Sequence, residues 1–208
     1  MATQDSVADI LIDIQHKADQ RCTWNQAWPM VPLFFLRLLL TFTYIMASLG
    51  LLPDGSYTTV ECWINGLSAL CLLALSKAHS RYGIAALLMG ISMAFAALTS
   101  LMGSMLLLTV IYGLLIMVSN FVEYSANSKI TEQFERSLQR KWNGLILWAF
   151  GTIFVGGFAF LLITVLSYVL EDLGIIILIV NYGPDLLVDI LYLIYLACTI
   201  RIIYKQGE

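Results

Sequence analysis

Apolar residues follow one another along this chain in long runs, and short polar segments separate the runs. A helix that crosses the hydrocarbon core of a bilayer needs about 20 predominantly apolar residues. The longest run, residues 82–122, is too long for one span even when the helix is tilted. We therefore divide it at residues 99–104 and predict two helices joined by a tight hairpin.

The pattern predicts an all-α, polytopic membrane bundle of six transmembrane helices with short connections. Residues 1–29 are expected to form a cytoplasmic segment with an amphipathic helix, residues 123–142 a cytoplasmic loop that continues as helix into the fifth span, and residues 205–208 a cytoplasmic tail. The six spans are predicted at residues 30–52, 60–78, 82–99, 104–122, 143–169 and 184–204.

The segment before the last span allows two interpretations. Residues 175–180 are apolar, but at about 1.5 Å per residue they cover only about a third of the hydrocarbon core. Asn181, Gly183 and Pro184 indicate a helix break directly after them. We favour a short re-entrant or interfacial piece. The alternative joins this piece to the last span as one long helix with a kink at Pro184.

The distribution of charge predicts the orientation. On one side of the six-span arrangement there are six acidic residues and no Lys or Arg, so that side sums to −6, whereas the remaining eight acids and eleven bases sum to +3. By the positive-inside rule, both termini are cytoplasmic, which requires an even number of spans. The acidic residues of the outer side are Asp54, Glu61, Glu171, Asp172, Asp185 and Asp189.

Composition excludes several classes of protein. Hydrophobic residues make up 60% of the chain and charged residues 12%, far from the composition of a soluble domain. The net charge of −3 and the lack of a long basic run leave no electrostatic footprint for nucleic acid. We therefore expect the lipid bilayer as the surroundings, with the bacterial cytoplasmic (inner) membrane as the default location, and no nucleic-acid partner.

Motifs for catalysis and metal binding are missing from the sequence. The four cysteines have no C-x-x-C spacing, and the two histidines are far apart without a second ligand nearby. A Gly-x-Ser-x-Gly motif for a nucleophilic serine is also absent. We expect no enzyme activity, no metal and no cofactor.

The last predicted span carries Asp185 and Asp189, which lie on one helix face because they are four residues apart. Ionisable groups within spans mark ion or proton pathways. Pro184 suits the first position of a helix, so Asp185 is interpreted as a first-turn residue that the helix dipole favours. Asp189 lies deeper and, with Asp185 and Glu61, is a candidate for an ion or proton pathway. The alternative is that the acidic residues of the outer side have no such role and stand out only because the positive-inside bias keeps Lys and Arg away from that side.

Arg37 is the other charge inside a predicted span. Helical side chains lean toward the N-terminus, which is the cytoplasmic end of this helix, so we expect the guanidinium to reach the interface. A direct pair with Asp189 is not expected because the two residues enter the membrane from opposite faces. Glu123, at the cytoplasmic end of the fourth span, is a geometrically easier partner.

Small residues follow helical spacing in two spans. Ala86, Gly90 and Ala94 do so in the third span, and Thr152 and Gly156 in the fifth. Such stripes allow helix backbones to approach closely in lipid. We expect them to pack within the chain, and packing between chains is the alternative.

Two functions remain from the sequence. The favoured one is a non-catalytic membrane subunit or anchor of a larger assembly with other membrane protein subunits, in a hetero- or homo-oligomer. Its support is the small aqueous mass and the missing catalytic residues. The alternative is a small cation or proton channel or transporter that uses Asp189, Asp185 and Glu61.

Overall fold

The computed structural model describes residues 22–53, 56–102, 106–167 and 174–207, with side chains at all of these except 56, 100–102, 155–167, 174–182 and 207. Helices and the turns between them make up this part of the chain. The all-α prediction is confirmed. The amphipathic helix predicted near the N-terminus lies outside the described residues.

Five helical stretches within the described residues are long and apolar enough to cross a membrane. The predicted count of six spans stays a prediction, although a further helix, α7 (Arg136–Ser167), has 32 residues and therefore ample length for a span. The five stretches are Trp24–Ser48, Tyr57–Leu75, Ser80–Thr99, Leu106–Glu132 and Gly183–Gln206.

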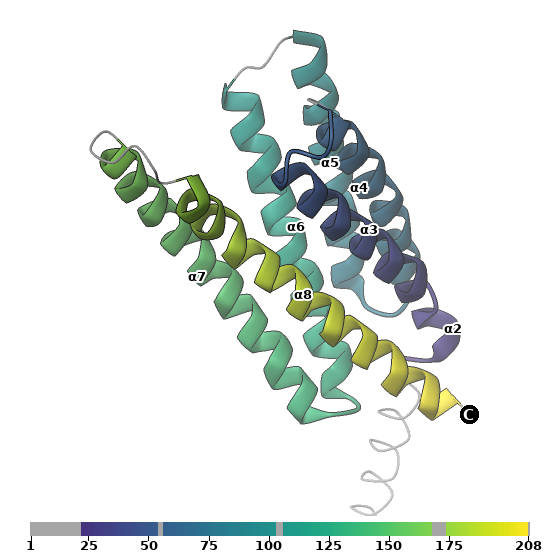
Figure 1. The fold of residues 1–208 in the computed structure, drawn as a ribbon. Helices are drawn as coiled ribbons and strands as arrows, with labels where there is room; N and C mark the ends of the chain where they lie inside the picture. The colour runs from purple at the N-terminus through teal and green to yellow at the C-terminus, as the bar shows by residue number, and fades with distance from the viewer. Residues whose placement is uncertain (1–21, 54–55, 103–105, 168–173, 208) are drawn as a thin grey trace, which may run out of the picture.

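The long helices form a closed ring in chain order (Figure 1). Each helix packs against the next one, and the last long helix returns to pack against the first. A single helical turn, α2, precedes the ring, and Figure 1 shows α2, the α6–α7 turn and the C-terminus at the same lower end. The elements are α2 (Trp24–Ala27), α3 (Met30–Ser48), α4 (Ser56–Leu75), α5 (Ser80–Met102), α6 (Leu106–Glu132), α7 (Arg136–Ser167) and α8 (Gly174–Gly207).

The structure tests two of the predicted connections between helices. The hairpin near residue 100 is confirmed, because α5 ends at Met102 and α6 begins at Leu106. Of the loop predicted at 123–142, the expected helical continuation into the fifth span is present, because α7 begins at Arg136, whereas its first part is wrong as a loop, because α6 continues to Glu132. The last turns of α6 stay helical because their side chains pack inside the bundle, as the buried Ile130 illustrates.

The predicted helix break is also wrong. The helix α8 continues through Asn181, Gly183 and Pro184, so residues 175–180 are its first turns and not a re-entrant piece. A proline inside a helix removes one backbone hydrogen bond, whereas a broken helix in hydrocarbon would leave several backbone groups unsatisfied. Asp185 is consequently not a first-turn residue. Asp189 lies 15 residues after the first residue of α8, about 22 Å along the helix axis.

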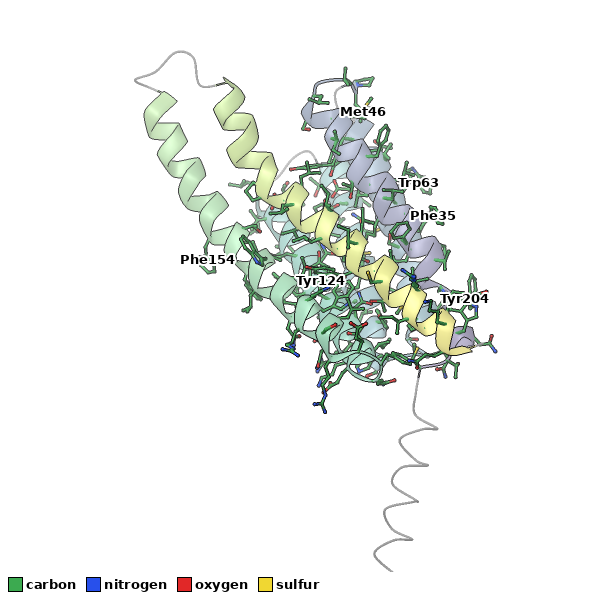
Figure 2. The ribbon with its side chains drawn as sticks, turned by 60° about the horizontal axis from the view of Figure 1, so that its bottom comes forward. Phe35, Met46, Trp63, Tyr124, Phe154 and Tyr204 are labelled. Atoms are coloured by element: carbon green, nitrogen blue, oxygen red, sulfur yellow. The ribbon has the colours of Figure 1, made fainter. Side chains whose placement is uncertain are left out.

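Aromatic side chains fill the ring toward its lower end. The fully buried Trp142 on α7 has its ring 6.1 Å from that of Tyr124, 5.7 Å from that of Tyr192 and 5.9 Å from that of Tyr195. Its indole N–H donates to Thr199 Oγ1 at 3.1 Å, so the polar atom of this ring also has a partner. Figure 2 shows Tyr124 in the interior of the bundle.

The outer surface of the ring is apolar. Exposed side chains include Phe35 on α3, Trp63 on α4 and Phe154 on α7, and Figure 2 shows Phe154 pointing away from the bundle. In water such a surface would be an aggregation hazard, whereas hydrocarbon covers it without cost. The exposed apolar side chains therefore fit contact with lipid.

The small residues of α5 do not pack as predicted. Ala86 is buried, but Gly90 and Ala94 are exposed, and a Cβ atom added at Gly90 would meet nothing within 4 Å. The expectation of packing within the chain is therefore wrong for these two residues. The buried face of α5 carries the large residues Tyr82 and Met89 together with the small residues Ala85, Ala86 and Ser92. The surroundings of Gly156 lie outside the described side chains.

We expect the two tryptophans of α7 to differ strongly in their effect on stability. Trp142→Ala removes a fully buried ring and should cost about 3–5 kcal/mol of unfolding free energy. The control Trp148→Ala removes a ring that is 60% exposed and should change stability by about 0.5 kcal/mol or less. Helical circular dichroism during thermal unfolding in detergent measures both. Equal losses of stability in the two variants would show that the ring of helices does not pack as described.

Candidate functional site

A buried ion pair lies inside the helix ring. Arg37 Nη2 on α3 donates to Glu123 Oε2 on α6 at 2.7 Å and to Asn120 Oδ1 at 3.1 Å. Only 9% of Arg37 is exposed, so the expectation that its guanidinium reaches the interface is wrong. The side chain turns inward because Glu123, the partner that the sequence indicated as the easier one, lies across the ring.

The helix α8 completes this arrangement. The Tyr192 hydroxyl donates to Glu123 Oε1, and the Tyr192 ring centre lies 5.9 Å from Arg37 Cζ. Glu123 is fully buried, and each of its two oxygens accepts a hydrogen bond from a different helix. Arg37, Glu123 and Tyr192 therefore connect α3, α6 and α8, and we call these three residues the three-helix node.

A groove of about 240 Å³ lies between α6, α7 and α8. Asp185 and Asp189 both line it, which confirms that the two carboxylates share one face of their helix. Most of the other lining side chains are apolar or aromatic. The lining residues are Gly113, Ile116, Met117, Asn120, Phe121, Tyr124, Ala149, Thr152, Ile153, Asp185, Val188 and Asp189.

A second, much smaller cavity of about 20 Å³ lies between α3, α6 and α8. Asn120, Tyr124 and Asp189 line both this cavity and the groove, so these residues stand between the groove and the three-helix node. Asp189 and Arg37 share the small cavity, although no ion pair joins them in the described part of the chain. The remaining lining residues are Leu40, Thr41 and Tyr192.

Not every charged side chain around the groove and the small cavity has a partner in an ion pair between described residues. Arg37 is neutralised by Glu123, and the other ion pair between described residues joins Lys129 to Glu132 at the surface. Within the described residues, Asp189 therefore has no basic side chain in an ion pair. A lone carboxylate in the middle of a membrane helix is costly unless water, a proton or a cation reaches it. The groove provides the space for such a ligand.

Glu61, the third acidic candidate, belongs to a different part of the ring. It lies on α4, and the Tyr112 hydroxyl of α6 donates to Glu61 Oε1 at 3.1 Å. The Asn65 side chain in turn donates to that hydroxyl at 3.5 Å. Glu61 does not line the groove. The structure thus brings Asp185 and Asp189 together and leaves Glu61 apart from them.

The sequence prediction missed four residues that line these spaces. Asn120 and Tyr124 on α6, Thr41 on α3 and Tyr192 on α8 were hidden among apolar neighbours. A signal exists in the spacing for Asn120, Thr41 and Tyr192, because each lies three or four residues from a charged residue already identified, which places both on one helix face. Tyr124 directly follows Glu123 and has no such signal.

Two ionisable groups at the lower end of the helix ring, outside the spans, have shifted pKa values. Partial burial lowers the pKa of His79, and the charges of Arg81 and Lys129 lower it further. His79 Nδ1 accepts a hydrogen bond from the Arg81 backbone N–H at 3.2 Å, which fits a neutral imidazole. Burial raises the pKa of the Cys22 thiol to about 11, so this thiol stays protonated at neutral pH.

Comparison of the chain with protein-family models, with curated proteins and with solved structures returns no match. The class of the protein therefore follows from its own architecture. A ring of apolar helices with an apolar outer surface and a buried polar node defines a polytopic α-helical membrane protein.

Removing one partner of the buried ion pair should destabilise the fold. Glu123→Gln leaves the Arg37 charge uncompensated, and we expect a loss of about 3–5 kcal/mol in unfolding free energy. The control Glu132→Gln breaks the exposed pair with Lys129 and should leave stability unchanged. Replacing Arg37 and Glu123 together by methionine should recover part of the loss. Equal stability of the Glu123→Gln and Glu132→Gln variants would contradict the role of the node.

Proposed function

We propose that the protein is a small membrane transporter or channel for a proton or small cation, with Asp189 as the carboxylate that binds it. The observation that carries this proposal is the position of Asp189 at the boundary between the groove and the small cavity. Asp185, one helical turn away, lines the same groove and adds a second carboxylate along the path to Asp189.

The depth of Asp189 supports transport over a purely structural role. A carboxylate near a helix start is explained by the helix dipole, but α8 begins 15 residues before Asp189. Its counter-charge is not provided by Arg37, because that guanidinium already pairs with Glu123. An ionisable group in this position is most simply explained by a ligand that neutralises it reversibly.

Transport should depend on Asp189 and not on Glu61. In vesicles that contain the purified full chain, Asp189→Asn should lower proton or cation flux by more than about tenfold, a change of about 1.4 kcal/mol in the barrier. The matched control is Glu61→Gln, which removes a half-buried carboxylate outside the groove. It should keep the flux of the unmodified protein. Unchanged flux in the Asp189→Asn variant would remove the transport proposal.

A second proposal, a non-catalytic subunit of a larger membrane assembly, is favoured by a different observation. Gly90 and Ala94 are exposed on the outer face of α5, where they would allow another helix to approach closely. Native mass measurement of the complex purified in mild detergent separates the two proposals. A stable complex with a different chain, together with unchanged flux in Asp189→Asn, would favour the subunit.

A further inference from the structure

One residue that lines the small cavity, Arg37, has a buried hydrogen-bond donor without a partner among the described residues. Among the described side chains, Arg37 Nε is buried and no acceptor lies within hydrogen-bond distance of it, whereas Arg37 Nη2 has two acceptors. The arginine is about nine-tenths buried, and it lines the cavity that Asp189 also lines. A buried guanidinium N–H without an acceptor is costly, so this donor indicates a ligand that can accept a hydrogen bond.

The volume of the cavity limits the size of this ligand. About 20 Å³ is enough for one water molecule, which needs roughly 10–15 Å³ of such space and two to four polar partners. The residues that line the cavity include Arg37, with its unpartnered N–H donor, Asp189, with a carboxylate that can accept, and the polar Thr41 and Asn120. We propose that this cavity holds a single water molecule that bridges Arg37 Nε and Asp189, and that the species bound by Asp189 is a proton.

A proton fits the surroundings of Asp189 better than a metal ion does. A metal ion cannot accept a hydrogen bond from Arg37, whereas the water molecule that accompanies a proton can. The described residues contain no group of three or more His, Cys, Asp or Glu side chains that could hold a metal. The groove is also lined mostly by apolar side chains, whereas hard cations require several oxygen ligands.

The titratable and charged groups around Asp189 come from four helices, because Tyr57 of α4 also interacts electrostatically with Asp189. Arg37 faces it from α3, Tyr124 lines both spaces from α6 with Glu123 behind Arg37, and α8 itself adds Asp185 and Tyr192. The described groove residues of α7 are Ala149, Thr152 and Ile153, and none of them titrates in the physiological range. The Arg37–Glu123 pair has no net charge. Binding of one proton neutralises Asp189 and therefore leaves Arg37, Glu123 and Asp189 together without net charge.

The proton step balances without another reactant. A hydronium ion in the groove transfers a proton to a carboxylate oxygen of Asp189 and remains there as water, while the carboxylate becomes a neutral carboxyl group. The bridging water stays hydrogen-bonded to Arg37 Nε in both states, and it donates to Asp189 when the carboxylate is charged. This inference rests on the proposed transport function, which it restricts to protons.

The test fills the cavity without touching a charged group. Thr41→Leu adds volume at a residue that lines the cavity, and Thr43→Leu makes the same change on the same helix outside it. Proton flux is measured with a pH-sensitive dye inside vesicles, and Na⁺ and K⁺ fluxes are measured in parallel. Infrared difference spectra of each variant against its own Asp189→Asn derivative report the carboxyl band of Asp189.

Thr41→Leu should lower proton flux by more than about tenfold and shift the Asp189 carboxyl band, whereas Thr43→Leu should change neither. Because Thr41→Leu could also disturb the fold, Arg37→Lys is a second variant. It keeps the positive charge, lacks the Nε donor and should shift the same band. The water site is overturned if Thr41→Leu and Arg37→Lys both leave the proton flux and the Asp189 carboxyl band unchanged. If Asp189→Asn still abolishes the flux, the transport function stands.

Two other outcomes separate the proton from the transport function. If the unmodified protein carries Na⁺ or K⁺ and no protons, the assignment of the proton is overturned while the proposed function stands. If it carries none of the three, the proposed function fails. The water site is then tested by the infrared band of Asp189 alone. An unshifted band in both Thr41→Leu and Arg37→Lys overturns it.

Discussion

The ion pair between Arg37 and Glu123 is the contact on which the rest of the structure depends. It joins α3 to α6 across the ring, and Tyr192 adds α8 to the same carboxylate. Taking two charges out of water is costly, and the pair offsets this cost only when its geometry is good and its remaining atoms find partners. The three helices are therefore held in one relative register, because sliding any of them would separate buried polar atoms in a low-dielectric interior.

This constraint also explains where the protein leaves space. The aromatic cluster around Trp142 fills the lower part of the ring beside the three-helix node. Next to the node, α6, α7 and α8 enclose the groove, and Asp185 and Asp189 both face it. Arg37 is already paired with Glu123, so no ion pair between described residues neutralises Asp189. The structural role of the node and the proposed role of Asp189 are thus two consequences of one charge arrangement.

Sequence alone predicted the helical membrane class, the hairpin near residue 100 and the partner of Arg37, because these depend on runs of apolar residues and on depth along a helix. It failed at Pro184, where local turn propensity indicated a break but the need to satisfy backbone groups in lipid favours a continuous helix. That error also placed Asp189 too close to a helix start. The closure of the ring by α8 against α3, which brings Tyr192 and Thr41 together at the small cavity, is a long-range contact that no local pattern contains.

The central claim is that the carboxylate of Asp189 is reached from water while its helix lies in the membrane. A single cysteine at position 189, in a chain whose native cysteines are replaced, tests this with a water-soluble cationic thiol reagent. The control is a single cysteine at Ile190, which is 43% exposed on the outer surface of α8. The account predicts fast labelling at 189 and slow labelling at 190 in sealed vesicles. Labelling at 189 as slow as at 190 would contradict it. The native cysteines are Cys22, Cys62, Cys71 and Cys198.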